Sequence, residues 1–150
     1  MEFNIPHAMQ VEHEELHVDL EKAIASGGET GAAAREVAEA LHSHFESEER
    51  YALPPLGLLP ALAEGRISSE MTQVLEMTDT LKAELPRMLD EHKLIVDALQ
   101  KLIGAARKEK KMEHIHFAEK LMLHAQNEEE VSYPTAILIG EYVKLKLGVH

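Results

Sequence analysis

Hydrophobic residues recur every three or four positions along four long stretches of the chain, which is the period of a helix that buries one face. The stretches cover about residues 6–25, 31–53, 85–107 and 112–140. Pro6 stands at the start of the first stretch, and Gly27 and Gly28 follow its end, as expected for the two ends of a helix. The sequence contains no apolar–polar alternation over the length of a strand. We therefore expect an all-α fold with four main helices.

The segment between the second and third stretches, about residues 56–84, is longer than a simple hairpin connection. Pro and Gly interrupt its first half, and Ser68 or Ser69 could cap a helix in its second half. Pro86 then stands where a new helix would begin. We expect an additional helix in this connector, which covers one end of the fold or binds a partner.

Composition narrows the class of protein. The 150 residues include 15 Lys and Arg against 27 Asp and Glu, and this formal charge of −12 argues against binding to nucleic acid. No apolar run approaches the roughly 18 to 20 residues of a membrane span, and the acidic N-terminus is unlike a secretory signal. We expect one cytoplasmic domain over residues 1–150, with its core at about 6–140. Because cysteine is absent, any metal must be held by His, Asp or Glu.

The chain contains 10 His, and four of them occupy equivalent positions in an internal sequence repeat. The pattern His-x-x-x-Glu-Glu, with a Pro ten residues after the His, begins at His44 and again 80 residues later at His124. A Glu-His pair precedes each pattern and ends at His13 and, 79 residues later, at His92. The sequence therefore predicts two related helical hairpins, each with one His on its first helix and His-x-x-x-Glu on its second.

Helical spacing separates residues that face the core from those that face solvent. Six polar residues fall on the four hydrophobic faces: His13, His44, Glu48, His92, His124 and Glu128. Steps of three and four also place His114 and Val131 on the face of the last helix, but His114 lies about 15 Å along the axis from His124, too far to share a site. His17 and His42 fall on charged faces instead.

Six polar groups on buried faces need partners, because an unpaired buried carboxylate costs several kcal/mol or more. A metal satisfies carboxylates and imidazoles together, and this donor set suits Fe, Zn, Mn or Cu. Two metals that shared both Glu would each have two His and two carboxylates. Glu12 and Glu91 each precede one of these His and could orient neighbouring imidazoles, or could simply face solvent.

Other histidine patterns point to different chemistry. His13-Glu14-Glu15-Leu16-His17 matches the H-E-x-x-H pattern of zinc hydrolases, although His17 leaves the hydrophobic face. Three Glu-x-x-His spacings of the ferritin type, which end at His17, His42 and His116, lie largely on charged faces. A further possibility is an acidic, His-rich surface that either binds metal loosely or is only solvated, with His7, His17, His42, His114, His116 and His150 contributing.

The constellation of His13, His44-x-x-x-Glu48-Glu49, Glu91-His92 and His124-x-x-x-Glu128-Glu129 resembles the hemerythrin-like, or HHE cation-binding, family over about residues 6–140. The resemblance implies an up-and-down four-helix bundle around two non-haem iron ions, with Zn or Mn as possible substitutes. It also implies that the four histidines are terminal ligands and that Glu48 and Glu128 are bridging carboxylates. Members of the family bind O₂ reversibly, sense O₂ or redox state, handle nitric oxide, or store and regulate iron.

One position departs from the oxygen-carrying hemerythrins, which have a second His four residues after the third-helix ligand. This chain has Val96 there, so we expect one metal to keep an additional open or water-filled position. That difference favours redox sensing, peroxide or NO chemistry over stable O₂ carriage. We expect a protein that binds or senses O₂, NO or peroxide; the alternatives are a di-iron enzyme, an iron-handling protein, or a bundle whose site is only structural.

Overall fold

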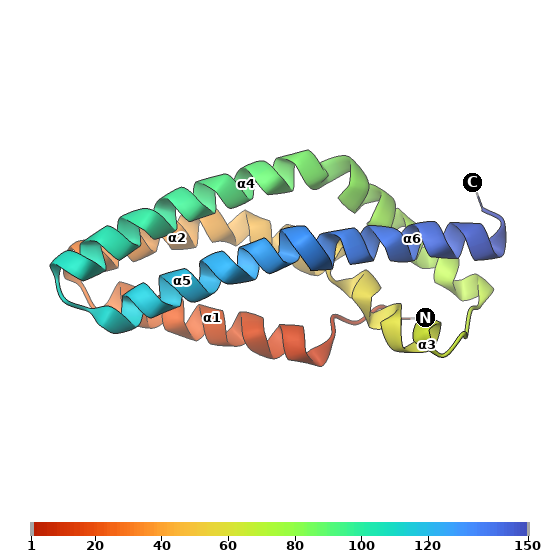
Figure 1. Ribbon diagram of the computed structural model, residues 1–150, viewed down its shortest axis with the longest axis horizontal. Helices are drawn as coiled ribbons and strands as arrows, with labels where there is room; N and C mark the ends of the chain where they lie inside the picture. The colour runs from red at the N-terminus through yellow and green to blue at the C-terminus, as the bar shows by residue number, and fades with distance from the viewer. Residues whose placement is uncertain (1, 150) are drawn as a thin grey trace.

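The computed structural model describes residues 2–149, which are almost entirely helical and contain no β-strand. The α-helices are α1 (His7–Ala25), α2 (Gly28–Ser47), α3 (Leu59–Ala63), α4 (Leu75–Lys108), α5 (Met112–Asn127) and α6 (Tyr133–Leu147). Figure 1 shows α1, α2, α4 and α5 lying alongside one another, with α6 continuing the line of α5. The expectation of an all-α fold is confirmed.

The four long helices enclose a common interior. Helix α2 packs against α4, α4 against α5, and α1 against both α2 and α5. The turn from α1 to α2 and the turn from α4 to α5 lie at the same end of the molecule (Figure 1). This arrangement is compatible with a four-helix bundle.

The buried hydrophobic residues form two cores, with a polar layer between them. One core includes Leu16 and Leu99, and the other includes Met88 and Tyr133. On α4, His92 lies between Met88 of the second core and Ile95 of the first. The buried histidines of the other long helices are placed in the same way along the sequence, so the two cores shield one polar layer from both ends.

Both helices with the His-x-x-x-Glu pattern change to π-helix at the Glu. The π segments are Glu48–Ala52 and Glu128–Ser132. A π turn closes through an i→i+5 hydrogen bond, so it takes one residue more than an α turn. The extra residue brings Tyr133, five residues after Glu128, onto the core face, where it is fully buried, while Val131 is 53% exposed. The sequence-based placement of Val131 on the core face is wrong, whereas Tyr51, at the equivalent position of the first π segment, is buried.

Helix α4 is longer than the sequence indicates. It begins at Leu75 and continues through Pro86, so the expectation of a separate helix beginning near residue 85 is wrong. Proline removes one helical hydrogen bond and crowds the preceding turn, and Figure 1 shows that α4 changes direction along its length. Between Ala52 and α4, the connector contains the short helix α3 and two 3₁₀ segments, Pro54–Leu58 and Ser69–Val74.

Two close contacts connect parts of the chain that are far apart in the sequence, one at the start of α2 and one between α6 and α4. The Glu109 carboxylate accepts hydrogen bonds from the backbone N–H (2.8 Å) and the hydroxyl of Thr30, at the start of α2. These bonds lower the pKa of Glu109 from 4.5 to about 2. Where α6 crosses α4, a Cβ added to Gly140 would lie 2.2 Å from Oγ1 of Thr78, so only glycine fits at this approach.

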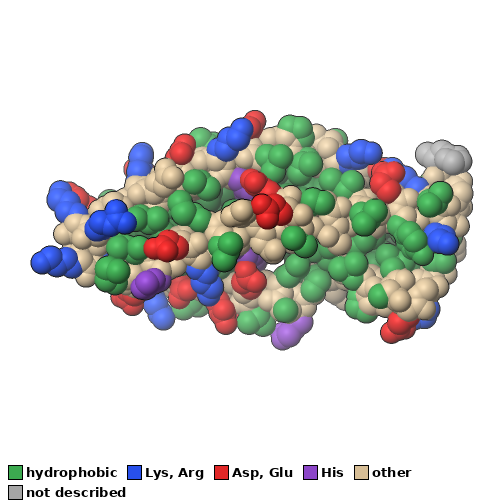
Figure 2. Space-filling model, in the orientation of Figure 1, with side chains coloured by type: hydrophobic (Ala, Val, Ile, Leu, Met, Phe, Trp, Pro, Cys, Tyr) green, Lys and Arg blue, Asp and Glu red, His purple; other side chains and the backbone are tan. Residues whose placement is uncertain are grey.

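The surface is charged over most helices, and α6 exposes hydrophobic side chains beside its charged ones. Hydrophobic side chains gather over this helix in Figure 2, and Leu138 and Leu145 are 65% and 79% exposed. None of the helices within residues 2–149 is both long and apolar enough to cross a membrane.

Candidate metal centre

The six polar residues on the hydrophobic faces come together in one buried cluster, called here the His/Glu cluster. Their side chains are at most 8% exposed. The ligand atoms form two overlapping groups, and within each group all atoms lie within 4.8 Å of one another. One group contains His13 and His124, here the α1–α5 pair, and the other contains His44 and His92, here the α2–α4 pair. Glu48 and Glu128 belong to both groups.

Each glutamate turns one oxygen towards each histidine pair. Glu48 Oε1 lies 2.6 Å from Nε2 of His44, and its Oε2 lies 3.5 Å from Nε2 of His13. Glu128 repeats this arrangement, with Oε1 3.4 Å from Nε2 of His92 and Oε2 3.3 Å from Nε2 of His124. The two carboxylates therefore connect the two pairs.

Four buried atoms of the α1–α5 group have no hydrogen-bond partner within residues 2–149. They are Nε2 of His13, Nε2 of His124, Oε2 of Glu48 and Oε2 of Glu128. An unsatisfied buried polar atom costs about 1–3 kcal/mol, so four at one point are unusual unless another group binds them. Imidazole nitrogen and carboxylate oxygen are donors that Fe, Zn and Mn accept. The cluster could therefore hold a metal ion.

A tyrosine stands at the α2–α4 pair. Nε2 of His44 and Nε2 of His92 are 2.8 Å apart, and the Tyr133 hydroxyl lies 3.2 Å and 3.1 Å from them. This hydroxyl donates a hydrogen bond of 2.9 Å to Oε1 of Glu48. Helical spacing did not indicate Tyr133, because the π turn that rotates it into the core leaves no clear mark in the sequence.

Three of the four imidazoles contact a second carboxylate at Nδ1, the nitrogen that faces away from the cluster. The pairs are Glu91 with His44, Glu129 with His92, and Glu12 with His124. The first two contacts are 3.0 Å long. A carboxylate at Nδ1 keeps the proton on that nitrogen and leaves the Nε2 lone pair free for a metal. Glu12 and Glu91 thus contact imidazoles rather than only solvent, and Glu129 is a further member that the repeat could have indicated.

Glu91 is itself held in place. Arg87 donates a hydrogen bond of 2.9 Å from Nη1 to Oε2 of Glu91 and one of 2.8 Å from Nη2 to the Tyr51 hydroxyl. The chain of contacts from Arg87 through Glu91 to His44 fixes the orientation of this imidazole.

The pKa values of several residues of the His/Glu cluster are shifted strongly by burial and by their neighbours in the cluster. Burial opposes the charged form of His92 and of His124, but the nearby carboxylates, Glu128 foremost, outweigh it and raise the two pKa values to about 10 and about 9. Burial lowers the pKa of His13. Burial also disfavours the charged form of Glu48, but hydrogen bonds from imidazoles hold its pKa well below the usual value. In the metal-free chain, protons supply the positive charge that the carboxylates need, so metal binding should release them.

Within residues 2–149, none of the competing histidine patterns belongs as a whole to a group of side chains that could hold a metal ion. His17 of the H-E-x-x-H pattern is exposed, outside the His/Glu cluster, and its ring contacts Phe45 edge-on at 5.4 Å. The ferritin-type pairs are also exposed, as their charged faces indicated; they are Glu14 with His17, Glu39 with His42, and Glu113 with His116. Val96 is half-buried beside α5, where it lines a groove with Ala125.

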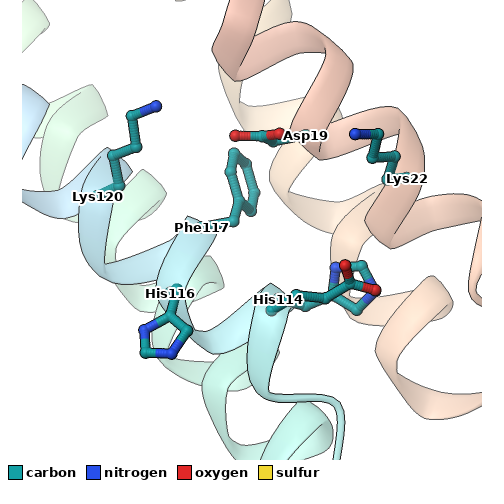
Figure 3. A pocket seen from close by; sticks show the side chains of 7 residues that line it. Asp19, Lys22, His114, His116, Phe117 and Lys120 are labelled. Carbon is teal, nitrogen blue, oxygen red and sulfur yellow. The ribbon is translucent and has the colours of Figure 1, made fainter.

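His114 is buried but lies outside the His/Glu cluster. It lines a pocket of about 180 Å³ between α1 and α5, together with Asp19, Lys22 and Lys120 (Figure 3). Its Nε2 lies 3.3 Å from Oε1 of Glu113. The pocket has both cationic and anionic side chains and so has no single preference for the charge of a ligand.

Comparison of the chain with models of known protein families, with curated proteins and with solved structures finds no match. Function is therefore inferred from the residues and geometry of the His/Glu cluster.

Proposed function

We propose that this protein is a hemerythrin-like, up-and-down four-helix bundle that binds two non-haem iron ions at the His/Glu cluster and uses them to bind or sense O₂, NO or peroxide. The observation that carries the proposal is the pair of overlapping ligand groups, which share both carboxylates. The shared end of the α1–α2 and α4–α5 turns supports the up-and-down arrangement.

Two ions fit the donor set better than one. Four histidines divide into two pairs, and each glutamate offers a separate oxygen to each pair. One ion at the α1–α5 pair would also satisfy the four atoms that otherwise lack partners. A second ion at the α2–α4 pair would separate two imidazole nitrogens that now face each other at 2.8 Å.

Iron fits the ligand count better than zinc. Each pair with its two carboxylate oxygens supplies four protein donors, which would complete a tetrahedral zinc site. Octahedral iron would keep about two positions, and iron supplies the redox chemistry and the affinity for small oxidants. Because position 96 is Val, the protein has no seventh ligand there, which favours sensing, peroxide or NO chemistry over stable O₂ carriage.

The chain itself performs three tasks in this proposal. Glu91, Glu129 and Glu12 orient the imidazoles through Nδ1. The Tyr133 hydroxyl places a hydrogen-bond donor beside the α2–α4 pair. The hydrophobic cores on both sides exclude bulk water from the buried layer.

Anaerobic titration of the metal-free protein with Fe(II) tests the proposal. Uptake should end at about two ions per chain, one for each ligand group. His44→Ala removes a ligand of the α2–α4 pair and should leave at most about one tightly bound ion. His42→Ala is the matched control, because its side chain is 78% exposed and pairs only with Glu46 on the surface, at 3.4 Å. Equal losses in the two variants, or no uptake by the unmodified chain, would contradict the proposal.

Exposure to oxidant then separates a binding protein from an enzyme. A binding or sensing protein gives a spectral change that is stoichiometric with the added peroxide or NO. Catalytic consumption over many equivalents would favour the alternative of a di-iron enzyme.

A further inference from the structure

Two surface grooves flank the His/Glu cluster at positions related by the sequence repeat. The α1–α2 groove, about 360 Å³, is lined among others by His17, Glu21, His42, Phe45, Glu46 and Glu49. The α4–α5 groove, about 540 Å³, is lined among others by Val96, Gln100, Met122, Ala125, Gln126 and Glu129. Shifts of 79 residues on the first helix and 80 on the second convert one set into the other, position by position. The two grooves are thus equivalent sites in the two halves of the fold, and they have different chemistry.

The first difference is whether a groove reaches a cluster histidine. In the α1–α2 groove the Phe45 ring stacks on His13, with ring centroids 4.9 Å apart, and His13 does not line the groove. The equivalent of Phe45 is Ala125, whose side chain is a single methyl group, and there His92 itself lines the groove. Both imidazoles are buried, with His13 6% and His92 2% exposed, so the grooves differ in which of them has a cluster histidine in its wall and not in the static exposure of that histidine.

The second difference is charge. The α1–α2 groove contains Glu21 and Glu46, where the α4–α5 groove has Gln100 and Gln126. The His at positions 17 and 42 are likewise replaced by Val and Met at the equivalent positions. Lys93 and Asp97 also line the α4–α5 groove and balance each other in charge. The same helical repeat folds with either set of side chains, so folding alone does not require the difference.

We propose that the α4–α5 groove is the port through which small uncharged molecules, of the class of O₂, NO and hydrogen peroxide, reach the His/Glu cluster, and that Phe45 closes the equivalent route. A molecule that passes the His92 ring arrives at the Tyr133 hydroxyl, which is 3.1 Å from Nε2 of His92. The port therefore serves the α2–α4 pair. The identity of the molecules that use the port rests on the proposed function. The accessibility of the cluster through the groove is a property of the chain and is testable without metal.

Dissolved O₂ is the probe for this test, because it is paramagnetic and accelerates the relaxation of nearby protons in nuclear magnetic resonance. In the metal-free protein under O₂ pressure, the enhancement should be several-fold larger at the His92 ring than at the His13 ring. Ala125→Phe should reduce the enhancement at His92 several-fold, and Phe45→Ala should raise it at His13. Enhancement at His13 equal to or above that at His92 in the unmodified chain, or no effect of Ala125→Phe, would overturn the proposal.

A second variant keeps the test decisive if Ala125→Phe does not fold, since Ala125 is only 6% exposed. Val96→Phe narrows the same groove from the half-buried wall of α4 and should also reduce the enhancement at His92. In the iron-loaded protein, either variant should slow NO binding several-fold at unchanged iron content, whereas His42→Ala should not.

The failures of the two proposals are distinguishable. If the Fe(II) titration fails while the O₂ contrast between the two histidines holds, the proposed function is wrong and the port stands. If the titration succeeds and the contrast is absent, the port is wrong and the proposed function stands.

Discussion

Replacement of Glu91 with Ala perturbs the His/Glu cluster without removing any of its six members. Glu91 contacts Nδ1 of His44 at 3.0 Å, and its other oxygen accepts a hydrogen bond from Arg87. The variant therefore frees the outer nitrogen of His44, whose Nε2 faces the cluster. The imidazole loses both the group that fixes its orientation and the charge that raises its basicity.

The expected loss follows from the behaviour of such carboxylate–histidine contacts. Removal of this kind of partner typically lowers metal affinity about 10- to 100-fold, or about 1.4–2.7 kcal/mol. A chain of 150 residues has an unfolding entropy of about 0.3 kcal/mol per degree, so at saturating metal its midpoint should fall by about 4–9 °C. Without metal, the variant loses the contact to Nδ1 of the buried His44 as well as a part-exposed ion pair with Arg87; the ion pair contributes about 1 kcal/mol or less.

Glu84→Ala is the matched control. Glu84 also binds Arg87, at 2.6 Å, and is 42% exposed, but it makes no hydrogen bond to a histidine within residues 2–149. Calorimetric titration should show weaker metal binding for Glu91→Ala than for Glu84→Ala, and thermal unfolding should separate the two variants more widely with metal than without it. Glu91→Gln, whose amide oxygen can still accept the proton of Nδ1, should recover part of the loss. Equal metal affinities for Glu91→Ala and Glu84→Ala would refute the reasoning.

Two further predictions concern the fold. Gly140→Ala should destabilise the chain by about 1–3 kcal/mol in denaturant unfolding, because the new Cβ collides with a threonine on α4; Gly104→Ala, with nothing within 4 Å, should instead stabilise the helix by about 0.5–1 kcal/mol. Glu109→Gln should lower the unfolding midpoint, since the pKa of Glu109 is depressed to about 2 by its bonds to Thr30. The stability from this carboxylate is complete above its ordinary pKa of 4.5 and is lost as the pH falls towards 2, so the gap between variant and wild type should close over that range. A constant gap down to pH 2, or an equal effect of Glu119→Gln, would contradict this.

The sequence predicted which residues come together because two periodic signals agree. Three–four spacing placed His44 and Glu48 on a buried face, and the 80-residue repeat identified His124 and Glu128 as their equivalents. The same spacing excluded His42, which is exposed. That the six cluster residues are metal ligands stays a prediction, because their position is compatible with that role but does not identify the ion.

The features that the sequence did not predict depend on local departures from a regular helix. The π turn after Glu128 brings Tyr133 to the cluster, and no periodic pattern records an extra residue in a turn. Helix α4 continues through Pro86, because packing along its length outweighs the local cost of proline. The cover that Phe45 forms over His13 depends on the contact between two helices, which spacing along one helix does not specify.

The metal content of anaerobically purified protein, with its absorption spectrum before and after admission of air, tests the central claim most directly. The account predicts about two irons per chain, one for each ligand group, and a near-ultraviolet to visible band that changes on exposure to O₂. A single zinc per chain with no spectral response would contradict it.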